Sequence, residues 1–229
     1  MSELNGAEYN AVLFDLDGTL VDTAPDMVAV LQNLQREHGV PETAYELARS
    51  NVSNGAAGLL TVGFPEYVFE FGDEMHQLYL ERYAELICEE SRVFDGLGKL
   101  LDELDAMGCP WGVVTNKPTQ LTLPLLVALG LADRAACMVS GDTLSVRKPD
   151  PAPLLLACDI AGVDPQTSIY IGDAERDIEA GQRAGMATIA AGYGYITADD
   201  DPREWDADVI ATTAEELAQI ILKAVNLDL

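Results

Sequence analysis

The sequence predicts an α/β fold in which helices cover a parallel sheet and a helical domain is inserted after the first strand. Short apolar runs rich in β-favouring residues recur along the chain, and helical patterns separate the later ones. That alternation is typical of a Rossmann-like parallel sheet wrapped by helices. Runs such as WGVV and SIYI are apolar on both faces, as buried parallel strands require. The predicted strands are residues 11–14, 111–114, 137–139, 168–171, 187–190 and 209–211.

The first strand is followed by a long stretch, residues 15–110, with little strand pattern. A helix is expected to begin at Thr23, with Pro25 in its first turn. Asp26 follows Thr23 by three residues, as in an approximate capping box. The apolar stripe of this helix stops near Gly39.

Further helical patterns lie around residues 45–49 and 66–87, so the economical interpretation is a helical insert over residues 22–92. The α/β core then comprises residues 1–21 and 93–229. Ligands of open α/β sheets bind beyond the carboxyl ends of the strands, so an insert at this point would cover the site as a lid. The core helices are predicted at residues 96–107, 121–129, 152–161, 174–184 and 214–225.

The chain has 229 residues, of which 48% are hydrophobic, enough for one sizeable core or for a core with a smaller companion domain. Its formal net charge is −26, from 13 Lys and Arg against 39 Asp and Glu. Such a chain repels nucleic-acid phosphates and anionic membranes, so we expect neither as a partner. A small anionic substrate would need a local positive potential.

The four cysteines are far apart and form no Cys-x-x-Cys pair, which indicates reduced thiols. The opening MSELNGAEYN lacks the pattern of a signal peptide. The longest uncharged runs, such as residues 118–132, are too short and too interrupted to span a bilayer. We expect a soluble cytoplasmic protein, a monomer or a dimer.

Two aspartates, Asp15 and Asp17, come directly after the first predicted strand. If the strand continues to Asp17, its period of two places both carboxylates on one face, with Leu16 on the other. Carboxylates this close repel each other by on the order of 1 kcal/mol unless a cation or proton lies between them. An ordinary surface turn at Asp17-Gly18 is the alternative. Asp22 is expected to serve the turn or the start of the next helix.

Polar residues also follow later strands. Thr115 and Asn116 come after WGVV and are good phosphate donors, although both are equally good helix caps. Arg147 and Lys148 form a positive cluster in an acidic chain, and a Lys-Pro pair alone is more typical of a loop.

Two more acids, Asp173 and Asp177, lie at the end of the strand predicted at 168–171. One helical turn separates them, so they can share a cation. Stabilisation of acids at a helix N-terminus is the structural alternative.

Taken together, these four stretches are expected at one edge of the sheet, because each follows a predicted strand. They combine four carboxylates, one lysine, and hydroxyl and amide donors. That set suits a hard, oxygen-preferring cation such as Mg²⁺ together with a phosphate. The metal and Lys148 would also oppose the overall negative charge locally.

The motifs DLDGT, TN, KP and GDAERD, in this order and spacing, resemble those of the haloacid dehalogenase-like superfamily and span most of the chain. The helical insert resembles the cap domain of that family. Within the superfamily, GVVTNKP, SNGAAGLL, KPDPAPLLLA and YGYI are similar to the phosphoglycolate phosphatase group and to relatives that act on phosphorylated amino sugars.

The resemblance implies a role for each motif residue. Asp15 would be the nucleophile that forms an aspartyl-phosphate, and Asp17 the acid and base that serves the leaving alcohol and the attacking water. Thr115 and Asn116 would hold phosphate oxygens, and Lys148 would offset the charge on the phosphoryl group and Asp15.

The implied cofactor is Mg²⁺. Asp173 would coordinate it together with the Asp15 carboxylate and the Asp17 carbonyl, and Asp177 would support that set of ligands. True dehalogenases lack the second aspartate and need no metal, so Asp17 favours phosphoryl chemistry.

The implied activity is Mg²⁺-dependent hydrolysis of a small-metabolite phosphomonoester, with phosphoglycolate the first candidate. A sugar or amino-sugar phosphate such as N-acetylmuramic acid 6-phosphate is an alternative substrate. A sugar-phosphate mutase and a non-catalytic metabolite-binding module are alternative functions.

Substrate choice is expected to lie with the insert. Arg49 and the loop at residues 53–58, including Gly55, are candidates to reach the site, and Lys117 is a further one. An ordinary exposed arginine and a simple glycine turn are the alternatives for the first two.

Overall fold

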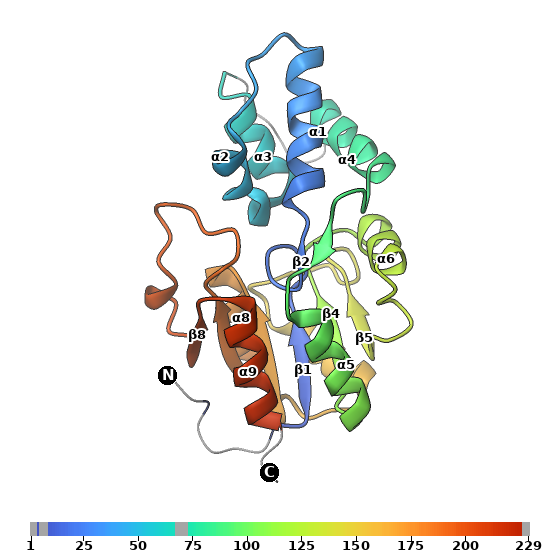
Figure 1. Cartoon of the computed structure of the whole chain (residues 1–229), viewed down its shortest axis with the longest axis vertical. Coiled ribbons are helices and arrows are strands. Elements are labelled where there is room, and N and C mark those ends of the chain that lie inside the picture. Colours follow the sequence, from blue (N-terminus) through green and yellow to red (C-terminus); the bar gives the residue numbers. More distant parts are fainter. Residues whose placement is uncertain (1–3, 5–8, 67–72, 226–229) are drawn as a thin grey trace.

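In a computed structural model of the chain, which describes residues 4, 9–66 and 73–225, six parallel strands form one sheet. The strand order is β5-β4-β1-β6-β7-β8, so β1 lies inside the sheet (Figure 1). This confirms the predicted α/β class. Four predicted strands have the observed bounds, and those beginning at 168 and 187 extend one residue further. The strands are β1 (Ala11–Phe14), β4 (Trp111–Val114), β5 (Cys137–Val139), β6 (Ser168–Gly172), β7 (Ala187–Ala191) and β8 (Val209–Ala211).

Helices cover both faces of the sheet, and β1 alternates between them. Val12 and Phe14 belong to the apolar core shared with α5, α6 and α9, whereas Leu13 belongs to the core shared with α7 and α8. This alternation is the period of two of a strand buried on both sides. These helices are α5 (Leu97–Met107), α6 (Thr119–Ala128), α7 (Ala152–Ala161), α8 (Glu175–Ala184) and α9 (Ala214–Val225).

The strand register brings three motif segments to one edge of the sheet. Phe14 of β1 lies opposite Val113 of β4 and Ile171 of β6. The residues that follow these strands, among them Asp15, therefore emerge side by side at the carboxyl edge.

The helices between β1 and α5 lie together beyond this edge (Figure 1, top). They are α1 (Ala24–Glu37), α2 (Tyr45–Arg49), the short 3₁₀ helix η1 (Val52–Asn54), α3 (Gly55–Gly63) and α4 (Glu74–Glu85). They share an apolar core to which Leu31, Leu60 and Tyr79 belong, and Leu121 of α6 and Tyr195 join this core from the sheet side. An antiparallel pair, β2 (Val21–Asp22) with β3 (Arg92–Val93), connects them to the sheet on both sides. We retain residues 22–92 as the proposed insert.

Helices η1 and α3 correct the expectation of a loop over residues 53–58. Residues 53 and 54 belong to η1, and Gly55, with a φ of +66°, ends η1 and is the first residue of α3. Gly58 lies in the first turn of α3. The helix forms because Leu59 and Leu60 are fully buried in the insert core, and that burial outweighs the low helix propensity of glycine.

The predicted capping box at the start of α1 is wrong. The Thr23 side chain makes no capping hydrogen bond, and its hydroxyl donates to Asp17 Oδ1 at 2.7 Å. Asp26 is buried and accepts from the amide and the hydroxyl of Ser91 at 2.9 and 2.6 Å. Both side chains are therefore used for tertiary contacts, which local sequence spacing does not reveal.

The helix predicted around residues 66–87 corresponds to α4, which is shorter and ends at Glu85, and residues 67–72 lie outside the described residues. Within the described parts of the chain, no helix has the length and apolar character needed to cross a membrane.

Candidate active site

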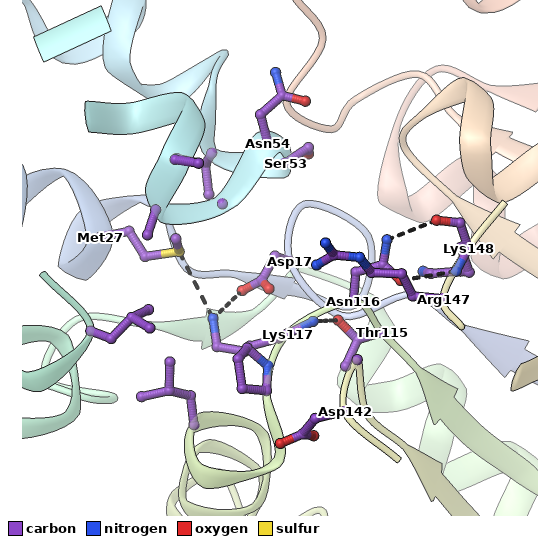
Figure 2. A pocket seen from close by; sticks show the side chains of 18 of the residues that line it. Asp17, Met27, Ser53, Asn54, Thr115, Asn116, Lys117, Asp142, Arg147 and Lys148 are labelled. Atoms are coloured by element: carbon purple, nitrogen blue, oxygen red, sulfur yellow. Dashed lines mark hydrogen bonds and ion pairs between the residues drawn. The ribbon is translucent and has the colours of Figure 1, made fainter. Parts of the chain in front are cut away.

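A cavity of about 570 Å³ lies between the carboxyl edge of the sheet and the insert. The sheet contributes the polar motif side chains, several of which Figure 2 shows around the cavity. The insert contributes apolar and aromatic side chains, among them Met27, Val52, Tyr79 and Tyr83. The sheet side can thus bind charge, and the insert side offers apolar contact together with the polar side chains of Ser53, Asn54 and His76.

Lys148 is the cation at the base of this site, and its side chain is only 1% exposed. Its ammonium lies 2.7 Å from Asp15 Oδ1 and 2.6 Å from Asp177 Oδ1. The Tyr170 hydroxyl and the Val114 carbonyl are 2.7 and 2.9 Å away. Four oxygens therefore surround an ammonium with three N–H donors, which fixes it between the two carboxylates.

The carboxylates remain short of positive charge. Burial raises the pKa of Asp15 from 3.8 to about 6, with Lys148 opposing and Asp177 adding to the rise. Burial also raises the pKa of Asp173 to about 7, and Asp15 and Asp177 add to that shift. Burial alone would lower the pKa of Lys148, but Asp15 and Asp177 raise it above its usual value. Lys148 and Arg176 are thus the cations that interact with these buried acids, and an additional cation would stabilise the acids further.

Asn116 holds the main chain of Lys148. Its Nδ2 donates to the Lys148 carbonyl, and the Lys148 amide donates to its Oδ1, each at 3.1 Å (Figure 2). Neighbouring Thr115 is buried, and its hydroxyl oxygen accepts from the Lys117 amide at 3.1 Å. Asn116, predicted to bind phosphate, is therefore observed positioning the lysine.

Asp17 faces the cavity, although the strand ends at Phe14 and does not continue to it. Its Oδ1 accepts from Lys117 Nζ at 2.8 Å and from the Thr23 hydroxyl. Lys117 also lies 4.5 Å from the ring centre of Tyr83, so it contacts both the sheet side and the insert side of the cavity. The two aspartates share the cavity but have different lysine partners.

The acids meet the requirements of a divalent cation site. One side-chain oxygen from each of Asp15, Asp173 and Asp177 lies within 4.8 Å of the others. Asp173 Oδ1 is buried without a hydrogen-bond partner, which a metal ligand bond would satisfy. Oxygen donors of this kind fit Mg²⁺. Gly18 is required beside them, because it has a φ of +83° and a Cβ there would lie 2.1 Å from Asp173 Oδ2.

The other oxygen of Asp173, Oδ2, accepts from the Ser53 hydroxyl at 2.6 Å and from the Tyr195 amide at 2.8 Å. The Tyr195 hydroxyl donates to Asp22 Oδ1 at 2.6 Å and accepts from the amide of Ala24, the first residue of α1. Asp22 thus stays apart from the acid cluster and supports the start of that helix.

The candidates in the insert lie in different places. Arg49 lies over the Tyr195 ring, 4.8 Å from its centre, and does not line the cavity. The aromatic face attracts the guanidinium there. Gly55 does line the cavity and has a φ of +66°, a conformation that favours glycine.

Three residues near these acids were not assigned a role from the sequence: Tyr170, Arg176 and Tyr195. Ser53 belongs to the segment 53–58 that was expected to reach the site, and it does contact Asp173. Tyr170 carried a usable signal, because a tyrosine inside a buried strand needs a partner for its hydroxyl. Arg176 donates to the Ser53 carbonyl and lines the cavity. The sequence shows that Arg176 is a charged residue of the GDAERD motif, but it does not predict that Arg176 contacts Ser53 of the insert.

Chemically, the site offers a carboxylate held by a lysine, a second carboxylate that faces the same cavity, and a cluster of acids for a cation. Asp15 can act as a nucleophile and Asp17 can move a proton. Hydroxyl and amide donors at the strand ends can bind a tetrahedral anion.

The sequence of this chain is similar to a known protein family and to characterised relatives. The family model described as haloacid dehalogenase-like hydrolase matches residues 12–191. An N-acetylmuramic acid 6-phosphate phosphatase from Pseudomonas aeruginosa is 42% identical over 93% of this chain and 95% of its own. A phosphoglycolate phosphatase from Xanthomonas campestris pv. campestris is 43% identical over 90% of this chain and 94% of its own.

A solved structure has the same architecture. The crystal structure of a predicted phosphoglycolate phosphatase from Haemophilus somnus 129PT superposes with a TM-score of 0.81 at 28% identity. The match covers 95% of this chain and all of the other. The similarity thus includes both the sheet and the helices beyond its edge.

Proposed function

The chain belongs to the haloacid dehalogenase-like hydrolase family, and on this premise we propose that it is a Mg²⁺-dependent phosphatase for a small phosphorylated metabolite. The observation that carries the proposal is the position of Asp15, whose Oδ1 lies 2.7 Å from the Lys148 ammonium beside the cavity that Asp17 also lines. A lysine-bound carboxylate next to a second carboxylate suits phosphoryl transfer through an aspartyl-phosphate.

In the first step, an oxygen of Asp15 attacks phosphorus and the bond to the leaving alcohol breaks. Asp17 gives its proton to the departing oxygen. Thr115 and neighbouring backbone amides bind the phosphate oxygens, and Lys148 offsets the negative charge on Asp15 and the phosphoryl group. Asn116 keeps Lys148 in place through its main chain.

In the second step, Asp17 takes a proton from water, and the water oxygen attacks the phosphorus of the aspartyl-phosphate. Inorganic phosphate leaves and the Asp15 carboxylate is restored. Asp17 thus serves first as an acid and then as a base. It can accept a proton in the second step because it gave one up in the first.

Lys117 lies beside the proposed acid and base. Its ammonium is 2.8 Å from Asp17 Oδ1, so it also lies beside the leaving oxygen of a bound substrate. We assign to Lys117 the binding of a second polar or anionic group of the substrate.

Asp173, Asp177, the Asp15 carboxylate and the Asp17 carbonyl are the proposed Mg²⁺ ligands. When bound, the ion would neutralise charge that develops on the transferring phosphoryl group. The buried, unpartnered Asp173 Oδ1 supports this assignment.

Phosphoglycolate is the first candidate substrate, because its carboxylate would suit Lys117 and several relatives carry this name. An amino-sugar phosphate such as N-acetylmuramic acid 6-phosphate is the second. A cavity of about 570 Å³ with an apolar wall from Met27, Tyr79 and Tyr83 favours this larger substrate. A sugar-phosphate mutase would use the same motifs and differ in its product.

The proposed partner is a metabolite rather than a nucleic acid, in line with a net charge of −26. All four cysteines are free, which supports our proposal of a cytoplasmic location. We propose a monomer or a dimer.

A phosphate-release screen over two-carbon, sugar and amino-sugar phosphates tests the proposal. We expect release with Mg²⁺, loss of release with EDTA, and a preference for one of the two candidate classes. An isomerised sugar phosphate without equivalent free phosphate would identify a mutase. Inactivity across the panel with several divalent metals would favour a non-catalytic binding module.

A further inference from the structure

Ser53 connects the insert to the acid motif after β6 at two points. Its hydroxyl donates to Asp173 Oδ2 at 2.6 Å, and Arg176 donates to its main-chain carbonyl. Ser53 lies in η1 of the insert, whereas Asp173 and Arg176 lie at the end of β6 and in the first turn of α8. One residue of the insert is therefore bound through both its side chain and its backbone.

The two oxygens of Asp173 have different environments. Oδ2 accepts from Ser53 and from the Tyr195 amide, and these two donors define the rotation of the carboxylate. The same rotation leaves Oδ1 buried without a hydrogen-bond partner, and Asp173 contributes one carboxylate oxygen to the cluster with Asp15 and Asp177. A metal ion and Ser53 can thus bind Asp173 simultaneously, through different atoms.

The chemistry of the contact favours cooperation rather than competition. A serine hydroxyl is a neutral donor, so it orients the carboxylate without cancelling the charge that a cation needs. Hydrogen bonds to ligand carboxylates commonly strengthen metal binding in this way. Removing the hydroxyl would leave Asp173 Oδ2 with the Tyr195 amide as its donor, so the carboxylate would be less firmly oriented and the contact between η1 and the motif would weaken.

We propose that Ser53 is a positioning residue for Asp173. Metal binding and the contact of η1 with the sheet edge would then stabilise each other. The inference rests on the proposed function, because it needs the metal site assigned there. Thermodynamic linkage makes the effect reciprocal: whatever Ser53 adds to metal affinity, the metal adds to the stability of the Ser53 contact.

Calorimetric titration with Mg²⁺ tests the first half of the proposal. We expect Ser53→Ala to raise the Kd for Mg²⁺ by about tenfold or more. Ser50→Ala is the matched control, because the Ser50 hydroxyl donates to the Leu47 carbonyl within the insert at 3.1 Å. We expect this control to bind Mg²⁺ as the unchanged protein does.

Hydrogen exchange with and without Mg²⁺ tests the second half. We expect Mg²⁺ to slow exchange of backbone amides in residues 52–57 in the unchanged protein and in Ser50→Ala. The protection should be lost in Ser53→Ala, even at Mg²⁺ concentrations that saturate this variant.

The outcomes separate this inference from the proposed function. If the unchanged protein binds no Mg²⁺, the proposed metal site fails and the inference fails with it. If it binds Mg²⁺ and Ser53→Ala binds it equally well, the inference alone is overturned. A purely structural serine would lower the melting temperature equally with and without Mg²⁺ and leave the Kd unchanged, which also overturns it.

Discussion

The ammonium of Lys117 lies 2.8 Å from Asp17 Oδ1, in a cavity bounded by the sheet edge and the insert (Figure 2). The same ammonium lies 4.5 Å from the ring centre of Tyr83 in α4. Lys117 therefore contacts the proposed acid and base on one side and the insert on the other. A substrate that enters the cavity meets this lysine and the carboxylate together.

Replacing Lys117 with Met should change substrate preference more than general activity. A hydrogen bond to a charged group contributes about 1.5–3 kcal/mol, so kcat/KM for phosphoglycolate should fall by roughly 10- to 150-fold. For a simple aryl phosphate, which has no second anionic group, kcat/KM should fall much less. Steady-state kinetics on both substrates measures the difference. An equal loss on both would contradict the substrate-binding role of Lys117.

Replacing Asp15 with Asn should remove the nucleophile and lower kcat by more than about 10³-fold. Asn has the same shape and no charge, and burial already raises the pKa of Asp15 to about 6, so the fold should persist. Phosphate release and circular dichroism measure the two effects. Full turnover by a folded Asp15→Asn protein would refute the assignment.

Replacing Lys148 with Met should destabilise the fold as well as abolish activity. The change leaves Asp15 and Asp177 without their shared cation, at a cost of about 3–5 kcal/mol in the free energy of unfolding. Lys99→Met is a suitable control, because Lys99 is 84% exposed and pairs only at the surface with Glu103, so its loss should cost less than about 1 kcal/mol. Urea unfolding in EDTA compares the two variants. Similar decreases in the free energy of unfolding for the two variants would contradict the role of Lys148 as the shared cation of Asp15 and Asp177.

The metal-free protein should lose stability as the pH rises from about 4 to about 7. Burial raises the pKa of Asp15 and of Asp173 from 3.8 to about 6 and about 7, so the folded state holds more protons than the unfolded chain in this window. Binding more protons in the folded state makes stability fall with rising pH. Melting temperatures in EDTA across this window measure the slope.

Mg²⁺ should reverse part of that loss, because it competes with protons for the same carboxylates. We expect it to raise the melting temperature more at about pH 8 than at about pH 5.5. Asp173→Asn should reduce both the pH slope and the response to Mg²⁺. An equal response to Mg²⁺ at the two pH values would contradict binding at these acids.

The sequence alone determined the sheet and the edge at which the motif residues meet. Apolar runs of three to five residues, separated by helical patterns, are typical of a parallel sheet, and β1, β4, β5 and β8 were predicted with their observed bounds. Since polar residues directly follow buried parallel strands, their meeting at one edge follows from chain direction. The association of Asp15 with Asp173 was predictable for this reason, whereas Lys148 comes from the loop between β5 and α7 and Asp177 from α8.

Only the tertiary structure decided which partner each polar side chain has. Asp17 binds Lys117 and Thr23, Asp26 binds Ser91, and Asn116 binds the main chain of Lys148. Each of these contacts depends on angles and distances between elements that no local pattern encodes. Helix α3 was missed for a related reason, because its stability comes from burial of Leu59 and Leu60 against the insert core.

The contact of Ser53 with Asp173 likewise combines one feature that the sequence predicts with one that only the tertiary structure decides. The sequence placed an acid after β6 and a small polar segment in the insert, 120 residues apart along the chain. Chain direction fixed where the acid emerges, because a parallel strand has one carboxyl end. The way the insert packs over the sheet edge fixed which serine reaches it, and packing depends on the whole set of buried side chains rather than on either segment.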